Sequence, residues 1–184
     1  PDYTRFFPPL KGSQSLNYLS INRSKLSITL DLKSEDGKQK FFDLVKTADI
    51  VVDSFRPGVL QKMGIDYDHA KQHNEKIIYV AITGYGYTGA YKNLAGHDMN
   101  YLGYSGILGL SGDEEKPTLA ACQIADVAGG SYPAVVACLS ALWARERTGK
   151  GQFVDVAMTD CVMPLLSMQM GEFLNTGVII EGAL

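Results

Sequence analysis

The segment Lys76-Ile-Ile-Tyr-Val-Ala-Ile82 decides the fold, because it predicts a strand in the middle of a chain that alternates strands and helices. Two strands are predicted before it, at Leu26-Ser-Ile-Thr-Leu-Asp-Leu32, where apolar and polar side chains alternate, and at Asp49-Ile-Val-Val-Asp-Ser-Phe55. A fourth is predicted after it, at Gln152-Phe-Val-Asp-Val-Ala-Met158.

Helices are predicted between these strands. Ser34 supplies a hydroxyl cap, and the acidic residues after it suit the first turn of a helix. The predicted segments are a helix over 35–46, a short helical turn over 57–63, and helices over 66–73, 128–147 and 159–175. Strands and helices in this order predict an α/β fold with an open sheet, parallel where the crossovers contain helices.

Proline and glycine punctuate the first 25 residues, so 1–25 is predicted to be an extended arm and 26–184 the α/β domain. The 184 residues are 46% hydrophobic, enough to bury a core. The net charge of -3 and the lack of a like-charge run argue against a nucleic-acid partner.

The composition also bears on location. Three cysteines, an odd number set among apolar neighbours, are expected to be buried thiols in a reducing compartment. No uninterrupted apolar run reaches the roughly 18 residues of a membrane span, and the amino-terminal residues lack signal architecture. We therefore expect a cytoplasmic protein with no membrane partner.

Two segments carry the candidate chemistry. Ala95-Gly-His-Asp-Met-Asn-Tyr101 places the His97 imidazole in a glycine-rich loop, and Ile124-Ala-Asp-Val-Ala-Gly-Gly130 places the Asp126 carboxylate at a predicted helix start. An imidazole and a carboxylate are suited to moving a proton near neutral pH. The simpler alternatives are a loop histidine with Asp98 as a helix cap, and Asp126 as another cap.

At the predicted helix start, free backbone N–H groups could bind a developing oxyanion beside Asp126. Arg56 follows a predicted strand, so its guanidinium could meet a phosphate, although an arginine in a surface turn is the commoner case. Strand ends of this kind are where open α/β sheets bind ligands.

Other motifs give weaker signals. Gly84-Tyr-Gly-Tyr-Thr-Gly89 has the G-x-G-x-x-G spacing of a dinucleotide site, but no helical stripe and no acidic residue follow as that site requires. His69 and His73 are four residues apart but lack a third ligand at metal-site spacing. We therefore expect neither a nicotinamide or flavin cofactor nor a metal.

The chain resembles the family III CoA-transferase (CaiB/BaiF-type) superfamily, and within it the α-methylacyl-CoA racemase branch. The resemblance covers nearly the whole chain, in family order and spacing. It rests on Asn22–Lys25 with Ser27–Lys33, Ser54–Leu60 with Met63-Gly64, Ile82–Gly89, Ala95–Tyr101, Ala125–Gly130 and Thr148–Asp155.

This resemblance implies a Rossmann-like large domain that binds acyl-CoA, with no cofactor beyond the coenzyme A of the substrate. It also implies an interlocked homodimer, and the chain resembles only part of a member, so a missing complementary segment is the other expected partner. In the racemases, the positions of His97 and Asp126 flank the substrate α-carbon. Arg56 is a further candidate contact, and the segments that match CoA-contacting residues are Thr29, Leu30, Asp31 and Leu32, with Gly96, Asp98, Met99, Asn100 and Tyr101.

Three functions remain open on the sequence. The first is racemisation of a 2-methylacyl-CoA by α-proton exchange between His97 and Asp126. The second is CoA transfer between carboxylic acids, for which the resemblance implies an acyl anhydride on Asp126. The third is a non-catalytic CoA-binding fragment. Retention of His97 favours the racemase branch, because the transferases usually alter this motif.

Overall fold

The computed structural model describes residues 2–112 and 115–178, and the chain divides between Asp31 and Leu32 into two compact units. The first unit has short local elements where the sequence predicts an extended arm. They are η1 (Tyr3–Phe6), β1 (Leu10–Lys11), β2 (Gln14–Ser15) and α1 (Leu16–Ile21). β1 and β2 form an antiparallel pair around Gly12, whose φ is +62°, and the Ser15 hydroxyl accepts the Tyr18 N–H at 3.2 Å to start α1.

The strand predicted at Leu26–Leu32 is not formed. Residues 25–31 are in neither helix nor strand, and the Leu26 side chain is fully exposed. A strand needs a neighbour to complete its hydrogen bonds, and neither sheet of the described residues includes this segment. Its alternating pattern therefore predicted a strand that has no pairing partner within the described chain.

The second unit is built on a parallel sheet, which confirms the open α/β fold. Its strands are β3 (Ile50–Asp53), β4 (Ile78–Thr83) and β5 (Phe153–Ala157), in the order β3-β4-β5. Val52 pairs with Val80, and Val80 with Val154, so the central strand β4 has a parallel neighbour on each side.

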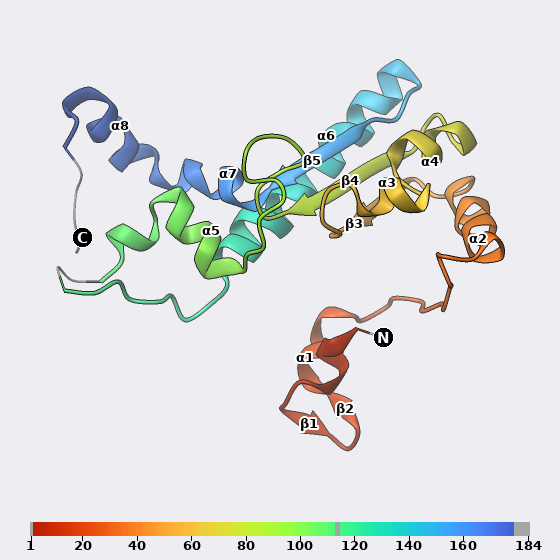
Figure 1. Cartoon of the computed structure of the whole chain (residues 1–184), viewed down its shortest axis with the longest axis horizontal. Helices are drawn as coiled ribbons and strands as arrows, with labels where there is room; N and C mark the ends of the chain where they lie inside the picture. Colours follow the sequence, from red (N-terminus) through yellow and green to blue (C-terminus); the bar gives the residue numbers. More distant parts are fainter. Residues whose placement is uncertain (1, 113–114, 179–184) are drawn as a thin grey trace. The chain divides into compact units, whose positions relative to one another are not determined.

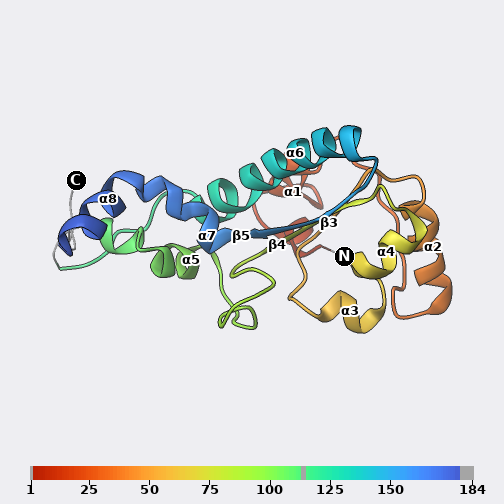
Figure 2. The ribbon, with the colours of Figure 1, turned by 90° about the horizontal axis from the view of Figure 1, so that it is seen from above.

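Helices cover both faces of this sheet (Figure 2). α2 (Glu35–Val45), α3 (Val59–Met63) and α4 (Tyr67–His73) share one core cluster with Ile77 and Tyr79. On the opposite face, α6 (Tyr132–Thr148) packs Ala134 and Ala141 against Ile78 and Val80. Because successive side chains of a strand point to opposite faces, β4 is apolar on both sides and forms the centre of the unit.

α5, α7 and α8 lie beyond the carboxyl ends of the strands (Figure 1). The remaining elements of this unit are α5 (Asp98–Ser105), η2 (Leu108–Leu110), η3 (Ala125–Ser131), α7 (Met158–Val162), η4 (Met163–Leu166) and α8 (Ser167–Thr176). η3 is a π-helix that continues into α6, so the helix predicted over 128–147 begins earlier and with a wider turn. The helix predicted over 159–175 is interrupted at η4, which contains Pro164 and hence one residue without a backbone N–H.

Local capping explains the helices that the sequence predicts best. The Ser34 hydroxyl accepts the Gly37 N–H at 3.1 Å at the start of α2, and Asp66 Oδ1 accepts the His69 N–H at 3.4 Å at the start of α4. These bonds satisfy backbone donors that a helix leaves free in its first turn. Both helix starts are therefore set by adjacent sequence.

One expectation drawn from composition is wrong, and a second remains untested. None of the cysteines is fully buried: Cys122 is exposed, and Cys138 and Cys161 are half-buried. The continuous helix Ala125–Thr148 is long and apolar enough to cross a membrane by length and composition, with mean hydropathy 1.4 in a window that is 22% buried. One such helix is weak support for a span, and its inner face packs on the sheet through Ala134 and Ala141.

Candidate active site

A pocket of about 440 Å³ opens at the carboxyl ends of the strands, where an open α/β sheet is expected to bind ligands. It gathers residues from the loop after β3, the end of β4, the loop before α5, the π-helix η3 and the start of α7. The lining comprises Ser54, Phe55, Arg56, Pro57, Ile82, Thr83, Gly84, Tyr85, Lys92, Leu94, Ala95, Gly96, His97, Tyr101, Asp126 and Met158. His97 and Asp126, predicted from separate motifs, thus line the same pocket.

The turn after β4 is held by side chains from two other places. The Thr83 hydroxyl accepts the Gly86 N–H at 2.9 Å, and Asp155 Oδ2 on β5 accepts the Tyr87 N–H at 2.8 Å. Thr159 on α7 donates its hydroxyl to the Gly84 carbonyl at 2.8 Å. The G-x-G-x-x-G segment is therefore a loop tied to β5 and α7, not the helix start of a dinucleotide site.

Tyr101 ties this turn to the histidine loop. Its hydroxyl donates to the Gly96 carbonyl at 2.6 Å, and its ring lies so close to both loops that only glycine fits beside it. A Cβ at Gly84 would be 2.3 Å from Tyr101 Cε1, and one at Gly96 would be 2.6 Å from it. Burial raises the pKa of the Tyr101 hydroxyl, so this group stays a hydrogen-bond donor at neutral pH.

His97 is the cap residue of α5, in place of Asp98. Asn100 Oδ1 accepts the His97 N–H at 3.0 Å, and the extended backbone of His97, with φ at -133°, leaves its exposed imidazole outside the helix. Asp98 is the first residue of α5, and its Oδ1 accepts the backbone N–H of Asp126 at 2.9 Å. This bond joins the two predicted motifs directly.

Asp126 is the second residue of the π-helix η3, not its cap, which is Ile124. Its side chain is open to the pocket. Asp126 is an exposed residue, but partial burial of its carboxyl raises the pKa above its ordinary value, the Asp98 charge raises this pKa further, and His97 lowers it. The backbone donors expected to hold an oxyanion are engaged here, because the Asp126 N–H bonds Asp98 and the Val127 N–H bonds the Gln123 carbonyl at 3.1 Å.

Arg56 and Lys92 bring positive charge to the pocket wall. Within residues 2–112 and 115–178, neither cation forms a salt bridge of 4.0 Å or less with a carboxylate. A guanidinium and an ammonium without an internal counter-ion are suited to binding a phosphate or carboxylate. Arg56 lies after β3 and lines the pocket, and its contact with a phosphate remains a prediction.

The other residues predicted to contact CoA are placed differently. Met99, 50% exposed, and Asn100 lie in the first turn of α5 outside the pocket lining, and Leu32 packs against the core cluster beneath α2 and α3. Thr29, Leu30 and Asp31 belong to the first unit, in the segment without helix or strand. Their role as CoA contacts remains a prediction.

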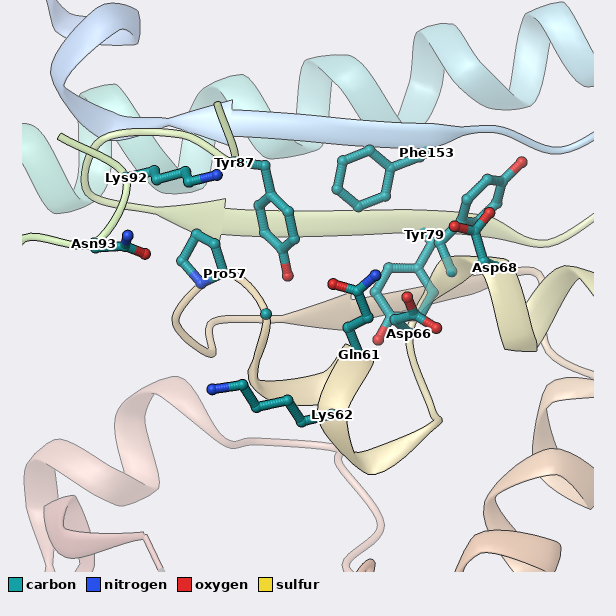
Figure 3. A pocket seen from close by; sticks show the side chains of 12 residues that line it. Pro57, Gln61, Lys62, Asp66, Asp68, Tyr79, Tyr87, Lys92, Asn93 and Phe153 are labelled. Atoms are coloured by element: carbon teal, nitrogen blue, oxygen red, sulfur yellow. The ribbon is translucent and has the colours of Figure 1, made fainter. Parts of the chain in front are cut away.

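A second pocket of about 530 Å³ shares Pro57 and Lys92 with the first. Figure 3 shows Lys62 and Lys92 at the Pro57 end of this pocket, and Asp66 and Asp68 at the opposite end. The cationic end is therefore the one that adjoins the first pocket. This arrangement extends the positive wall from Arg56 along to Lys62.

Sequence reasoning missed several residues of the site. Lys92 and Tyr85 line the pocket, and Asp155 and Thr159 hold its loop. Asp155 belongs to a segment on which the family resemblance rests, and Tyr85 belongs to the G-x-G-x-x-G motif. Neither of these sequence patterns predicts what the side chain of Asp155 or Tyr85 does in the site. Among the described residues, no group of three or more His, Cys, Asp or Glu side chains is arranged to hold a metal ion.

Fold and pocket together define an open α/β domain with a pocket at the carboxyl ends of parallel strands, where such sheets generally bind ligands. Comparison with known proteins identifies the family: the chain belongs to CoA-transferase family III, which it matches over residues 1–183. A CaiB/BaiF family protein from Brucella suis has a similar structure, with a TM-score of 0.90 and 38% identity, over 98% of this chain and 49% of that chain.

Relatives in this family are named for two kinds of reaction. Acetyl-CoA:oxalate CoA-transferase of Acetobacter aceti is 36% identical over 167 residues, covering 90% of this chain and 43% of that protein. α-Methylacyl-CoA racemase of Homo sapiens is 37% identical over 141 residues, covering 76% of this chain and 37% of that protein. The chain thus spans less than half the length of these two relatives.

Proposed function

We propose that this chain carries the acyl-CoA site of an enzyme that exchanges the α-proton of a 2-methylacyl-CoA, with His97 and Asp126 as the two proton carriers. The observation that carries the proposal is that both side chains line one pocket, together with Arg56. The His97 backbone N–H donates to Asn100 Oδ1 at the start of α5, and the Asp126 backbone N–H donates to Asp98 Oδ1, so both backbones are held beside the pocket.

The proposed reaction is a 1,1-proton transfer. One of the two groups takes the α-proton from one face of the thioester, which leaves an enolate, and the other group returns a proton to the opposite face. Imidazole and carboxyl share one exchangeable proton, so each turnover moves the proton from one group to the other. The raised pKa of Asp126 helps this carboxyl to carry the proton between turnovers.

The coenzyme A part of the substrate is proposed to lie along the positive wall. Arg56 and Lys92 line the first pocket, and Lys62 lines the second pocket beside Lys92. Cations in this arrangement suit the phosphate groups of coenzyme A. With these groups bound, the acyl thioester would reach the pocket that contains His97 and Asp126.

CoA transfer between carboxylic acids is the second candidate, favoured by relatives such as succinate–glutarate CoA-transferase of Agrobacterium fabrum, 38% identical over 161 residues. In that reaction the Asp126 carboxylate attacks the thioester carbonyl and expels the CoA thiolate, leaving a mixed anhydride. An acceptor carboxylate then attacks the Asp126 carbonyl of this anhydride, which releases the donor acid as its carboxylate and leaves an anhydride between the acceptor and Asp126. The CoA thiolate attacks the acceptor carbonyl of that anhydride, which forms the new thioester and frees the Asp126 carboxylate. This route needs Asp126 but no second base.

The partners of the site remain part of the proposal. We propose a second copy of the chain, or a complementary segment of a longer chain, as the structural partner. We also propose a cytoplasmic location, no nucleic-acid or membrane partner, no metal, and no cofactor beyond the coenzyme A of the substrate.

The test is deuterium uptake at the α-carbon of 2-methylacyl-CoA in D₂O by the complete protein, its His97→Ala and Asp126→Ala variants, and a His73→Ala control. His73 stacks on Phe42 and lines neither pocket. We expect uptake by the parent and the control, and a loss of about 10²–10⁴-fold in each site variant. Absence of uptake by the parent, with CoA transfer that survives His97→Ala, would replace the first candidate with the second.

A further inference from the structure

We propose that Asp98 is a positioning residue for Asp126: its carboxylate holds the Asp126 backbone and fixes where the Asp126 side chain stands in the pocket. This inference rests on the proposed role of Asp126. It assigns to Asp98 a bond within the protein instead of the substrate contact that the family resemblance implies.

The geometry of the bond carries the proposal. Asp98 Oδ1 accepts the Asp126 N–H at 2.9 Å across 28 residues of sequence, from the first residue of α5 to the second residue of η3. A hydrogen bond to an ionised acceptor is stronger than one between neutral groups. The bonded N–H belongs to Asp126 itself and is attached to the same Cα as its side chain, so the bond limits the directions in which that side chain can point.

Both ends of the bond are anchored in one packed cluster. Tyr101 and Leu102, one turn after Asp98, are buried with Ala125, which precedes Asp126, and with Val162 on α7. Because neighbouring residues on both sides are buried in this cluster, the bond joins two elements that are packed together. The same α5 start carries His97, so one carboxylate links the positions of both proposed proton carriers.

Asp98 also acts on Asp126 through its charge, since the pKa of the Asp126 carboxyl is raised first by burial and then by Asp98. Charged and titratable groups around Asp126 come from several elements. They are His97, the cap of α5, with Asp98 and Tyr101 of α5, and Arg56 and Lys92 of the pocket wall. Of the other elements packed against η3, β5 carries Asp155, and α7 carries Asp160 and Cys161. Asp98 is the carboxylate among them that raises the pKa of Asp126.

A first-turn aspartate can also stabilise its own helix through the helix dipole alone. Asp36 in the first turn of α2 offers a matched control, because it lines neither pocket and pairs with Lys40 on its own helix. If Asp98 served only its helix, Asp98→Asn and Asp36→Asn would have similar small effects on melting temperature and none on Asp126.

The first experiment follows the Asp126 carboxyl by ¹³C NMR during a pH titration of the complete protein, with Asp126→Asn to assign the signal. We expect a lower pKa of Asp126 in Asp98→Asn than in the parent, and an unchanged pKa in Asp36→Asn. This readout needs no turnover, so it tests the contact even where the proposed function fails. An Asp126 pKa that is the same in the parent and in Asp98→Asn would overturn the proposal.

The second experiment measures kcat and KM for whichever reaction the parent catalyses. Asp98→Ala removes both acceptor and charge, and we expect kcat to fall by about 10²-fold, as for a small displacement of a reacting group, with KM changed by less than about threefold. Asp98→Asn keeps an acceptor oxygen and should retain most of kcat, with the acid limb of the pH profile moved to lower pH. An active parent whose Asp98→Ala variant keeps kcat within about twofold would refute a positioning role. A parent that catalyses neither α-proton exchange nor CoA transfer would count against the proposed function instead. The pKa of Asp126 measured by NMR would then test the proposal for Asp98.

Discussion

Asp126 has a proposed chemical role, and its ionised carboxyl also lowers the free energy of unfolding. Burial and the Asp98 charge raise the pKa of its carboxyl above 3.8, so the ionised form is less stable in the folded chain than in the unfolded chain. Above the raised pKa this cost is fully present. As pH falls through the raised pKa towards 3.8, the folded carboxyl takes up its proton first and the cost disappears.

We therefore predict that Asp126→Asn melts at a higher temperature than the parent at pH 7, and that the difference shrinks as pH falls towards 3.8. Asp43→Asn is the control of opposite sign. Hydrogen bonds from Lys46 and Gln39 lower the pKa of Asp43, so this substitution should lower the melting temperature at pH 7, and its effect should fade as pH falls through the lowered pKa. Thermal unfolding across pH checks both, and an Asp126→Asn difference that is constant with pH would contradict the prediction.

Tyr101 gives a second test of a single group. Tyr101→Phe keeps the ring against Gly84 and Gly96 but removes the hydroxyl that donates to the Gly96 carbonyl at 2.6 Å. We predict a loss of about 0.5–1.5 kcal/mol in the free energy of unfolding, measured by urea denaturation. Tyr104→Phe is the matched control, because no hydrogen bond of the Tyr104 hydroxyl to a described residue is found and 54% of the residue is exposed. Equal losses in the two variants would argue against a structural role for the Tyr101 hydroxyl.

These residues also show what the sequence can predict about the site. His97 and Asp126 were predicted because an imidazole beside glycine and a carboxylate before two glycines are unusual locally, and both line one pocket. The hydrogen bond between Asp98 and Asp126 is not predicted from the sequence, because the two residues are 28 apart and the residues next to Asp98 indicate only a helix cap. Bonds between distant segments depend on how helices pack, which local patterns do not encode.

The π-helix η3 depends on close packing that only glycine allows. A Cβ at Gly129 would lie 2.5 Å from Val162 Cγ1 and 2.6 Å from the Met158 carbonyl oxygen, both on α7. We predict that Gly129→Ala lowers the free energy of unfolding by about 1–3 kcal/mol, because α7 must move to accept the methyl group. Urea denaturation measures the change.

Gly171 in α8 provides the control for this substitution, since a Cβ there would meet nothing within 4 Å. Gly171→Ala should raise the free energy of unfolding by up to about 1 kcal/mol, the difference in helix propensity between the two residues. A Gly129→Ala protein as stable as Gly171→Ala would mean that η3 and α7 are not packed as closely as described.

Helices and strands whose positions depend on adjacent residues are predicted closely from the sequence. Elements that depend on packing between distant segments are not. α2 begins next to its predicted cap Ser34, α4 begins one residue inside its predicted range, and the apolar run at 76–82 predicts β4. The π-turn of η3 escaped prediction because it follows from the fit of Gly129 and Gly130 against Met158 on another helix. The prediction of a strand at Leu26–Leu32 is wrong. An alternating pattern indicates that a segment could form a strand, but a strand also needs a neighbouring strand to pair with.

The described chain leaves one helix face uncovered. Tyr132, Val135, Val136, Leu139 and Trp143 are each between 56% and 67% exposed, at the spacing that places them along one side of α6. Stable monomers rarely expose a continuous apolar patch of more than a few hundred Å². The opposite side of α6 packs on the sheet through Ala134 and Ala141, so this exposed side is available for another chain.

We predict that a second copy of the chain covers this face, in keeping with the homodimer proposed above. Sedimentation velocity should show a concentration-dependent dimer for the parent and a monomer for Leu139→Glu, because a charge in the middle of an apolar interface must lose its water without gaining a partner. Leu26→Glu, which changes a fully exposed leucine in the first unit, should leave the dimer unchanged. A parent that remains monomeric at all concentrations would contradict the prediction. So would a monomeric parent that binds lipid vesicles in a flotation assay by a surface that includes Leu139 and Trp143.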